Sequence, residues 1–231
     1  MRRAEFGHTD EVYFDSDGTV LKLFNQASKE QIEEEIKLLK KLEHLKVPKV
    51  MGELFTCRGK LALRYTKLEG KSKKHINSFE LEELALFLKE FHALNLKSNN
   101  PKLFTKKRVR ELVLNSNDER LKEVFNSLKV EPKESFVIHG DLFWDNIVFE
   151  ENRLGGVFDF IDACEGDPLF ELAVVSFSFG LNCEQKRGLL RTYGMAVEVD
   201  ELNEYIKYAL VYYCACRVKV GRDYKDLMRL L

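Results

Sequence analysis

Two short apolar runs near the middle of the chain each lead to an acidic residue, and this pattern restricts the fold more than any other feature of the sequence. The first run precedes the segment HGDLFWDN, which begins at His139 and contains Asp141 and Asn146. The second run, GVF, ends just before Asp159. Apolar runs of this length are typical of short buried strands. We therefore expect Asp141, Asn146 and Asp159 to meet at adjacent strand ends.

These three side chains are of the types that phosphoryl transfer requires. Mg²⁺ prefers hard oxygen ligands and keeps phosphates and waters as its other ligands, so Asn146 and Asp159 are the candidate metal ligands. Asp141 is the candidate group that accepts, or at least aims, the proton of an attacking hydroxyl. The alternative is that all three are ordinary turn residues, since Asp and Asn are common in turns.

Strand and helix patterns divide the chain into two parts. In the first part we expect one amphipathic helix at 27–45 and four strands, at 12–15, 19–24, 50–56 and 61–66. From Leu68 onward the pattern is mostly helical. We expect a helix at 81–94, one or two helices at 108–128, short strands at 136–138, 147–149 and 156–159, and helical structure from Pro168. We place the boundary at 67/68, which gives a small lobe at 1–67, a large lobe at 68–231 and an α+β fold.

A lysine lies inside the second expected strand. Lys22 has apolar neighbours, and Glu35 follows thirteen residues later on the expected helix. An ion pair between them would hold the ammonium group against the α- and β-phosphates of a nucleotide. The alternatives are that Lys22 is a surface residue, and that Glu33 or Glu34 is the partner. The segment 7–10 precedes the first hairpin, where a loop would cover the phosphates.

Composition excludes several classes of protein. The 231 residues carry a net charge of −1 and are 45% hydrophobic, which excludes wholesale disorder and gives no reason to expect a nucleic-acid partner. The longest apolar stretch, 169–181, is too short to span a bilayer, so no membrane partner is expected. Five cysteines, an odd number, indicate a reducing compartment. We expect a soluble cytoplasmic protein.

The segment HGDLFWDN, followed by FDFIDACEGDP, resembles the aminoglycoside phosphotransferase and choline kinase superfamily of small-molecule kinases. The blocks VLKLF, EEEIKLLKKLEHLKVPKV, LALRYTKLEG and LALFLKEFHAL are similar to the lysine strand, the glutamate helix, the interlobe hinge and a large-lobe helix of that family, in the same order. The HGDLFxDN and DFxxAC patterns resemble the homoserine kinases of this type most, whereas the GDPxxELA pattern is closer to the antibiotic-modifying members.

The resemblance implies a two-lobed, protein-kinase-like fold, with a small antiparallel-sheet lobe that contains one helix and a larger, mainly helical lobe. It implies an enzyme that transfers the γ-phosphate of ATP or GTP to an alcohol group with the help of Mg²⁺. The roles it assigns are catalysis by Asp141, metal binding by Asn146 and Asp159, nucleotide binding by Lys22, Glu35, Gly7, Thr9, Tyr65 and Lys67, and bracing of the loop by His139. At Tyr65 to Lys67 the backbone would hold the base, and Glu171, which replaces a common Asp, would also brace the loop.

The acceptor is the least defined part of the prediction. Acidic side chains, including Asp162 and Glu165, crowd the segment after Asp159 and favour a small acceptor with an amine, such as an aminoglycoside, homoserine or choline. Trp144 is either core or a wall of the acceptor pocket. A protein Ser/Thr kinase and a non-catalytic pseudokinase are the alternatives, although no Ala-Pro-Glu segment follows Asp159. The oligomeric state stays open.

Overall fold

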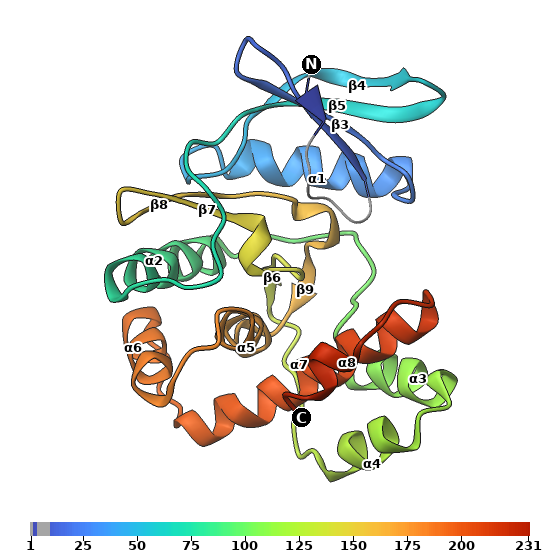
Figure 1. Cartoon of the computed structure of the whole chain (residues 1–231), viewed down its shortest axis with the longest axis vertical. Helices are drawn as coiled ribbons and strands as arrows, with labels where there is room; N and C mark the ends of the chain where they lie inside the picture. Colours follow the sequence, from blue (N-terminus) through green and yellow to red (C-terminus); the bar gives the residue numbers. More distant parts are fainter. Residues whose placement is uncertain (1, 4–9) are drawn as a thin grey trace.

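A computed structural model describes residues 2–3 and 10–231 and consists of two lobes (Figure 1). The small lobe is a five-stranded antiparallel sheet in the order β1-β2-β3-β5-β4, with helix α1 beneath it. Its elements are β1 (Arg2–Arg3), β2 (Glu11–Phe14), β3 (Thr19–Leu23), α1 (Lys29–Lys41), β4 (Val50–Cys57) and β5 (Lys60–Thr66). The expected strands and the expected helix are all present, although α1 is shorter than 27–45.

Local signals set the limits of α1. The side chain of Ser28 accepts a hydrogen bond from the backbone N–H of Gln31, and the side chain of Gln31 accepts one from the backbone N–H of Ser28, which forms a capping box. Ile32, Leu38 and Leu39 bury one face of the helix. Glu35 is buried with them, with only 2% of its surface exposed. The apolar face therefore fixes α1 in the orientation that carries Glu35 inward.

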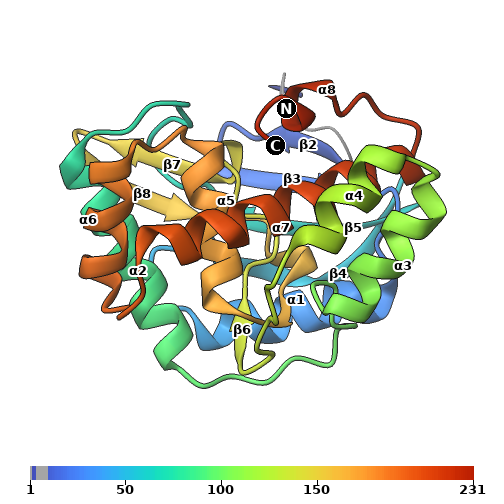
Figure 2. The same cartoon turned by 90° about the horizontal axis from the view of Figure 1, so that it is seen from below.

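The large lobe is mainly helical. Its helices are α2 (Ser78–Ala93), α3 (Lys106–Ser116), α4 (Glu119–Ser127), α5 (Pro168–Ser178), α6 (Cys183–Tyr193), α7 (Val199–Lys219) and α8 (Lys225–Met228). Seen from below, α5 and α7 cross the middle of the lobe, with α2 and α6 on one side and α3 and α4 on the other (Figure 2). The apolar stretch that begins at Leu169 forms α5, which is buried on all sides. Across 2–3 and 10–231, no helix is both long and apolar enough to cross a membrane.

In the large lobe, the structure settles one point that the sequence leaves open and adds one strand. The segment 108–128 forms two helices, because Asn117 adopts a left-handed conformation with φ of 53° and Asp118 caps the second helix. A strand at 164–166, too short to carry a pattern, pairs with the expected strand at 136–138.

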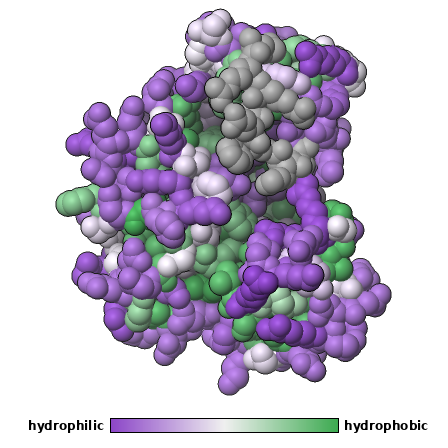
Figure 3. Space-filling view, viewed as in Figure 1, coloured by the Kyte–Doolittle hydropathy of each residue, from purple (hydrophilic) through white to green (hydrophobic). Residues whose placement is uncertain are grey.

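The side chains of both lobes share one continuous hydrophobic cluster. On the face shown in Figure 3, hydrophobic residues are visible between the lobes and hydrophilic residues cover most of the rest. The division at 67/68 stays a prediction, although β5 does end at Thr66.

Candidate active site

A pair of short strands brings the His139 loop beside the segment after Asp159. Strands β6 (Phe136–Ile138) and β9 (Cys164–Gly166) are antiparallel, with Ile138 opposite Cys164. The residues that follow β6 therefore lie next to the residues that precede β9. Gly140 illustrates how close they are, because a Cβ atom added there would lie 2.7 Å from the carbonyl oxygen of Asp162.

A second hairpin brings Asn146 and Asp159 to the same end. Strands β7 (Ile147–Glu150) and β8 (Arg153–Val157) pair with Ile147 opposite Val157. Just beyond this pair, the backbone N–H of Phe158 donates to the carbonyl oxygen of Asn146 at 3.1 Å. The flanking turns η1 (Trp144–Asn146) and η2 (Phe160–Asp162) complete the two loops. The expected meeting of polar residues at strand ends thus has a physical basis in two antiparallel pairs.

His139 ties the two loops together. Its imidazole is fully buried, and Nε2 lies 2.9 Å from the carbonyl oxygen of Phe158. Its Nδ1 accepts a hydrogen bond of 3.2 Å from the backbone N–H of Asp141. Because Nδ1 accepts, Nε2 must be the nitrogen that donates to the carbonyl. Both ring nitrogens are therefore occupied by backbone groups, which is the arrangement expected of a bracing residue.

Asp141 lies in an acidic environment. Burial, with the nearby carboxylates of Asp162, Asp159 and Asp145, raises the pKa of Asp141 well above its usual value. The side-chain amide of Asn146 opposes this shift, because it donates to Oδ2 of Asp141 at 3.4 Å as well as to the Asp141 backbone carbonyl oxygen at 2.8 Å. A carboxylate with an elevated proton affinity is suited to accept a proton from a hydroxyl group.

Lys22 reaches the same cluster from the small lobe. Its ammonium group lies 2.6 Å from Oδ1 of Asp159 and 3.2 Å from Oδ2 of Asp10, and the residue is 7% exposed. Burial alone would lower the pKa of Lys22, but the carboxylates of Asp159, Glu35 and Asp10 outweigh burial and raise it. The same contact with Lys22 holds the pKa of Asp159 below its usual value in spite of burial.

The expected ion pair between Lys22 and Glu35 is not formed. Glu35 instead accepts a hydrogen bond of 2.9 Å from the hydroxyl of Tyr65 and one of 3.0 Å from the backbone N–H of Phe160. Burial raises the pKa of Glu35 to about 7, against the opposing effect of Lys22. Glu35 therefore fixes the residue after Asp159, and acts on Lys22 only through its charge.

The side-chain oxygens of Asn146 and Asp159 fit a magnesium ion whose other ligands come from a bound nucleotide and from water. The amide nitrogen of Asn146 is used by Asp141, which leaves Oδ1 of Asn146 without a hydrogen bond to any described residue. Oδ2 of Asp159 is likewise left over after Lys22 takes Oδ1. The described chain holds no group of three or more His, Cys, Asp or Glu residues that would bind a metal. Two protein oxygens suffice for Mg²⁺ when phosphates and waters complete its shell.

The backbone N–H groups expected to bind the nucleotide base, at Tyr65 to Lys67, are already used within the protein. Tyr65 lies within β5, paired with Val20 and Val50 on its two sides, and its hydroxyl is bound to Glu35. The backbone N–H of Lys67 donates to the carbonyl oxygen of Gly18 at 3.1 Å, so it is not available to a base. Gly7 and Thr9, the other nucleotide-binding candidates, lie outside the described residues.

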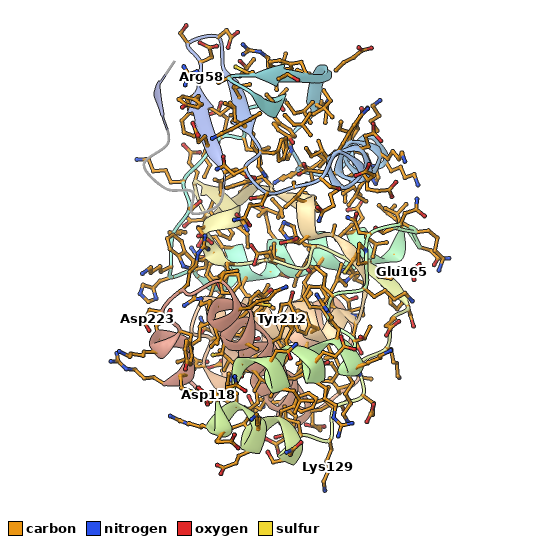
Figure 4. All side chains as sticks on the ribbon, turned by 90° about the vertical axis from the view of Figure 1, so that its right-hand side faces the viewer. Arg58, Asp118, Lys129, Glu165, Tyr212 and Asp223 are labelled. Carbon is orange, nitrogen blue, oxygen red and sulfur yellow. The ribbon has the colours of Figure 1, made fainter. Side chains whose placement is uncertain are left out.

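The three acceptor candidates separate in the structure. Asp162 lies beside the loop that carries Asp141, and burial together with the nearby charge of Asp159 raises the pKa of Asp162. The ring of Trp144 is partly buried and carries the ammonium group of Lys74 5.2 Å from its centroid. Glu165 lies instead at the edge of the molecule (Figure 4), where it forms ion pairs at 3.4 Å and 3.0 Å with Lys97 and Lys102. The prediction for Glu165 is corrected, because the strand β9 that follows Asp162 carries this side chain outward.

A buried hydrogen-bonded chain supports the loop from below. Oε1 of Glu171 accepts from the backbone N–H of Gly140 at 3.0 Å, and Oε2 lies 2.9 Å from Nε2 of His92. Nδ1 of His92 lies 2.9 Å from the hydroxyl of Tyr193. The bracing expected of Glu171 is present in this geometry. The sequence gives no signal for Tyr193. Tyr213 belongs to a group of tyrosines at roughly helical spacing that favours core packing, but no pattern points to its contact, in which its hydroxyl donates to the carbonyl oxygen of Gly140 at 2.7 Å.

Position 140 requires glycine, both for its backbone conformation and for lack of space, and this leads to a first prediction. Its φ is +84°, and an added Cβ would meet the Asp162 carbonyl and the ring of Phe104. Gly140→Ala is expected to lower the free energy of unfolding by more than the roughly 1–2 kcal/mol of a left-handed alanine. Gly180→Ala is the matched control, because φ there is +62° and nothing lies within 4 Å. Equal losses in the two variants, measured by denaturant unfolding, would contradict the packing account.

The fold and the clustered carboxylates are those of phosphotransferases with a protein-kinase-like fold. The chain belongs to the phosphotransferase enzyme family, whose profile matches residues 1–205. The recognition made from the sequence motifs is thereby confirmed, and so is the α+β, two-lobed fold.

Solved structures and curated relatives are consistent with this membership. The GDP and kanamycin complex of APH(2″)-IIia is similar over 99% of this chain and 90% of its own, with 19% identity and a TM-score of 0.76. Choline kinase LicA from Streptococcus pneumoniae is similar over 100% of this chain and 93% of its own, with 15% identity and a TM-score of 0.69. At these identities the likeness shows the fold. A homoserine kinase of Pseudomonas aeruginosa is 29% identical over 92 residues, which cover 35% of this chain and only 29% of that enzyme.

Proposed function

We propose that the protein transfers the γ-phosphate of ATP or GTP to a hydroxyl group of a small, amine-bearing molecule. The observation that carries this proposal is the convergence of Asp141, Asn146, Asp159 and Lys22 from three separate segments on one site. A fold of this kind does not by itself define an activity. The combination of a proton acceptor, two free oxygen ligands and a buried ammonium group is what phosphoryl transfer needs.

Each of these groups has a part in the mechanism. Asp141 accepts the proton of the acceptor hydroxyl as this oxygen attacks the γ-phosphorus, whose bond to the β,γ-bridging oxygen breaks to release the nucleoside diphosphate. Lys22 binds the phosphates of the nucleotide and stays charged, because the surrounding carboxylates raise its pKa. Asn146 and Asp159 would hold Mg²⁺, which neutralises phosphate charge when bound. Most of the catalysis is then positioning and charge stabilisation, with no covalent intermediate on the protein.

The base of the nucleotide lies, in this proposal, against the segment that follows β5. Leu68 and Glu69 come directly after Lys67, and no hydrogen bond within the described chain occupies their backbone N–H groups. These groups replace Tyr65 and Lys67 as the candidates for contact with the base edge. The glycine-containing segment 7–10 is proposed to cover the phosphates, and the ion pair of Asp10 with Lys22 at 3.2 Å supports this proposal.

The acceptor is proposed to carry an amine because the site is acidic. Asp162 and Asp145 both lie near enough to Asp141 to raise its pKa. A protonated amine would relieve this repulsion and bring a neighbouring hydroxyl to Asp141. The relatives support an amine-bearing acceptor. One similar structure is a kanamycin complex, another is a choline kinase, and a sequence relative is a homoserine kinase. The cytoplasmic location stays a proposal that rests on the cysteine pattern of the sequence.

A panel of acceptors tests separately whether the acceptor is a small molecule, whether it carries an amine, and whether it is instead a protein. ADP release is measured with Mg²⁺ and either ATP or GTP, against aminoglycosides, homoserine, choline, ethanolamine and a generic protein substrate. Glycerol and glucose serve as matched acceptors with hydroxyl groups and no amine. We expect turnover with at least one amine-bearing acceptor and none with the neutral ones. Turnover only on the neutral acceptors would overturn the amine claim, and turnover only on the protein would favour a protein kinase.

A further inference from the structure

The peptide bond that carries Asp141 is held at both ends by side chains. Its carbonyl oxygen, that of Gly140, accepts a hydrogen bond of 2.7 Å from the hydroxyl of Tyr213. Its N–H, that of Asp141, donates to Nδ1 of His139 at 3.2 Å. Because a peptide unit is planar, these two contacts together fix its rotation. The Tyr213 contact is the shorter of the two.

This peptide needs external support because it begins at a glycine. Glycine has access to more backbone conformations than any other residue, so Gly140 does not restrict the direction in which Asp141 points. Glu171 fixes the preceding peptide through the Gly140 N–H, but it does not touch the peptide that follows. Loss of the Tyr213 contact would leave the Gly140–Asp141 peptide with one hydrogen bond of 3.2 Å, to His139. The next peptide would still be held, because the Asp141 carbonyl oxygen accepts from the Asn146 amide at 2.8 Å and from the Phe143 N–H at 2.9 Å. The Tyr213 contact therefore controls the side of Asp141 that faces Gly140.

Tyr213 is itself fixed and remains a donor. Its ring packs against Phe143 with centroids 4.8 Å apart and against Tyr212 at 5.0 Å. Burial, together with the nearby Asp141, raises the pKa of the hydroxyl well above its usual value, so the proton needed for donation is retained. The adjacent Tyr212 on α7 is close enough to Asp162 for the two to interact electrostatically. Figure 4 shows Tyr212 in the interior of the large lobe.

We propose that Tyr213 is a positioning residue of the phosphotransferase: its hydroxyl fixes the Gly140–Asp141 peptide and so aims the Asp141 carboxylate at the acceptor. This proposal rests on the proposed function. Through Tyr213, helix α7 then stabilises the loop that carries Asp141, and through Tyr212 the same helix lies near the acidic residue Asp162. Tyr213 acts through Asp141, and its hydroxyl is used by the Gly140 carbonyl oxygen and not by Lys22, Asn146 or Asp159. Its effect should therefore fall on turnover and not on nucleotide binding.

The test compares Tyr213→Phe with Tyr208→Phe. Tyr208 lies on the same helix, is fully buried and donates its hydroxyl to the carbonyl oxygen of Phe104 at 2.9 Å. Each variant therefore loses one buried hydrogen bond from a tyrosine to a backbone carbonyl, and we expect similar falls in Tm. We expect kcat to fall about ten-fold in Tyr213→Phe, since a small misplacement of a catalytic group has effects of this size or greater. In Tyr208→Phe, kcat should stay close to that of the wild type, and the KM for ATP should be unchanged in both.

The outcomes distinguish this proposal from the one on which it rests. Equal kcat values in the two variants, or a rise in the KM for ATP in Tyr213→Phe with kcat unchanged, would overturn the positioning role and leave the phosphotransferase intact. A wild-type protein that turns over none of the acceptors would overturn both. A selective loss of kcat in Tyr213→Phe, with matched Tm values, would support the proposal.

Discussion

Asp141→Asn is expected to lower kcat by about 10²- to 10⁴-fold, the usual contribution of a general base. Asparagine keeps the size and the hydrogen-bonding outline of the side chain but cannot accept the proton of the hydroxyl. The backbone contacts of residue 141 with His139 and Asn146 do not involve the carboxylate and should survive. Nucleotide binding should therefore be retained.

The measurement pairs steady-state turnover with calorimetric titration of Mg²⁺–ATP. Removal of one of several crowded carboxylates relieves repulsion with Asp159 and Asp162, so we expect the variant to bind Mg²⁺–ATP at least as tightly as the wild type and to be no less stable. If Asp141→Asn lost nucleotide binding together with turnover, Asp141 would belong to the nucleotide site and its role as proton acceptor would be wrong.

Asp159→Asn is expected to remove the Mg²⁺ dependence of nucleotide binding and to lower kcat by at least about 10³-fold, which corresponds to the several kcal/mol that a metal ion contributes. The variant loses the only carboxylate among the candidate metal ligands. It also loses the charge that lies 2.6 Å from the ammonium group of Lys22. Asp10 lies 3.2 Å from the same ammonium group and keeps it paired, so the protein should still fold.

Asp162→Asn is the matched control for this prediction. The same chemical change is made three residues further along, within the same acidic cluster, on a side chain assigned to the acceptor. ATP binding is titrated with Mg²⁺ and with EDTA for both variants. We expect Asp162→Asn to keep the difference between the two titrations and Asp159→Asn to lose it. The same loss in both variants would show that general acidity, and not a defined metal ligand, controls binding.

Much of the local structure could be predicted because it depends on residues close together in the chain. The capping box between Ser28 and Gln31 is one example, and the hairpin that pairs Ile147 with Val157 is another. The meeting of Asp141, Asn146 and Asp159 follows from such short pairings, which is why their spacing in the sequence carried the prediction. The fold class followed from the resemblance of whole blocks, which the family match confirms.

The less predictable features all depend on which side chains meet across the folded molecule. Lys22 and Glu35 lie in one cluster as expected, but Lys22 bonds to Asp159 while Glu35 bonds to Tyr65. Three acidic groups surround one lysine, and spacing along the chain cannot rank them. Glu165 was expected in the site because it is near Asp159 in sequence, yet lysines from the loop that follows α2 hold it at the surface. Tyr213, 73 residues from Gly140, has no local pattern that would reveal its contact.

The central claim is that a phosphoryl group leaves the nucleotide and arrives on a hydroxyl group of a small molecule. The most direct test is mass spectrometry of both products after incubation with Mg²⁺, ATP and each amine-bearing acceptor, with Asp141→Asn run in parallel. The account predicts an acceptor heavier by one phosphoryl group, formed in equal amount with ADP by the wild type and nearly absent from the variant. Intact Mg²⁺–ATP binding with no phosphorylated acceptor from any member of the panel would contradict the claim and favour a non-catalytic nucleotide-binding protein.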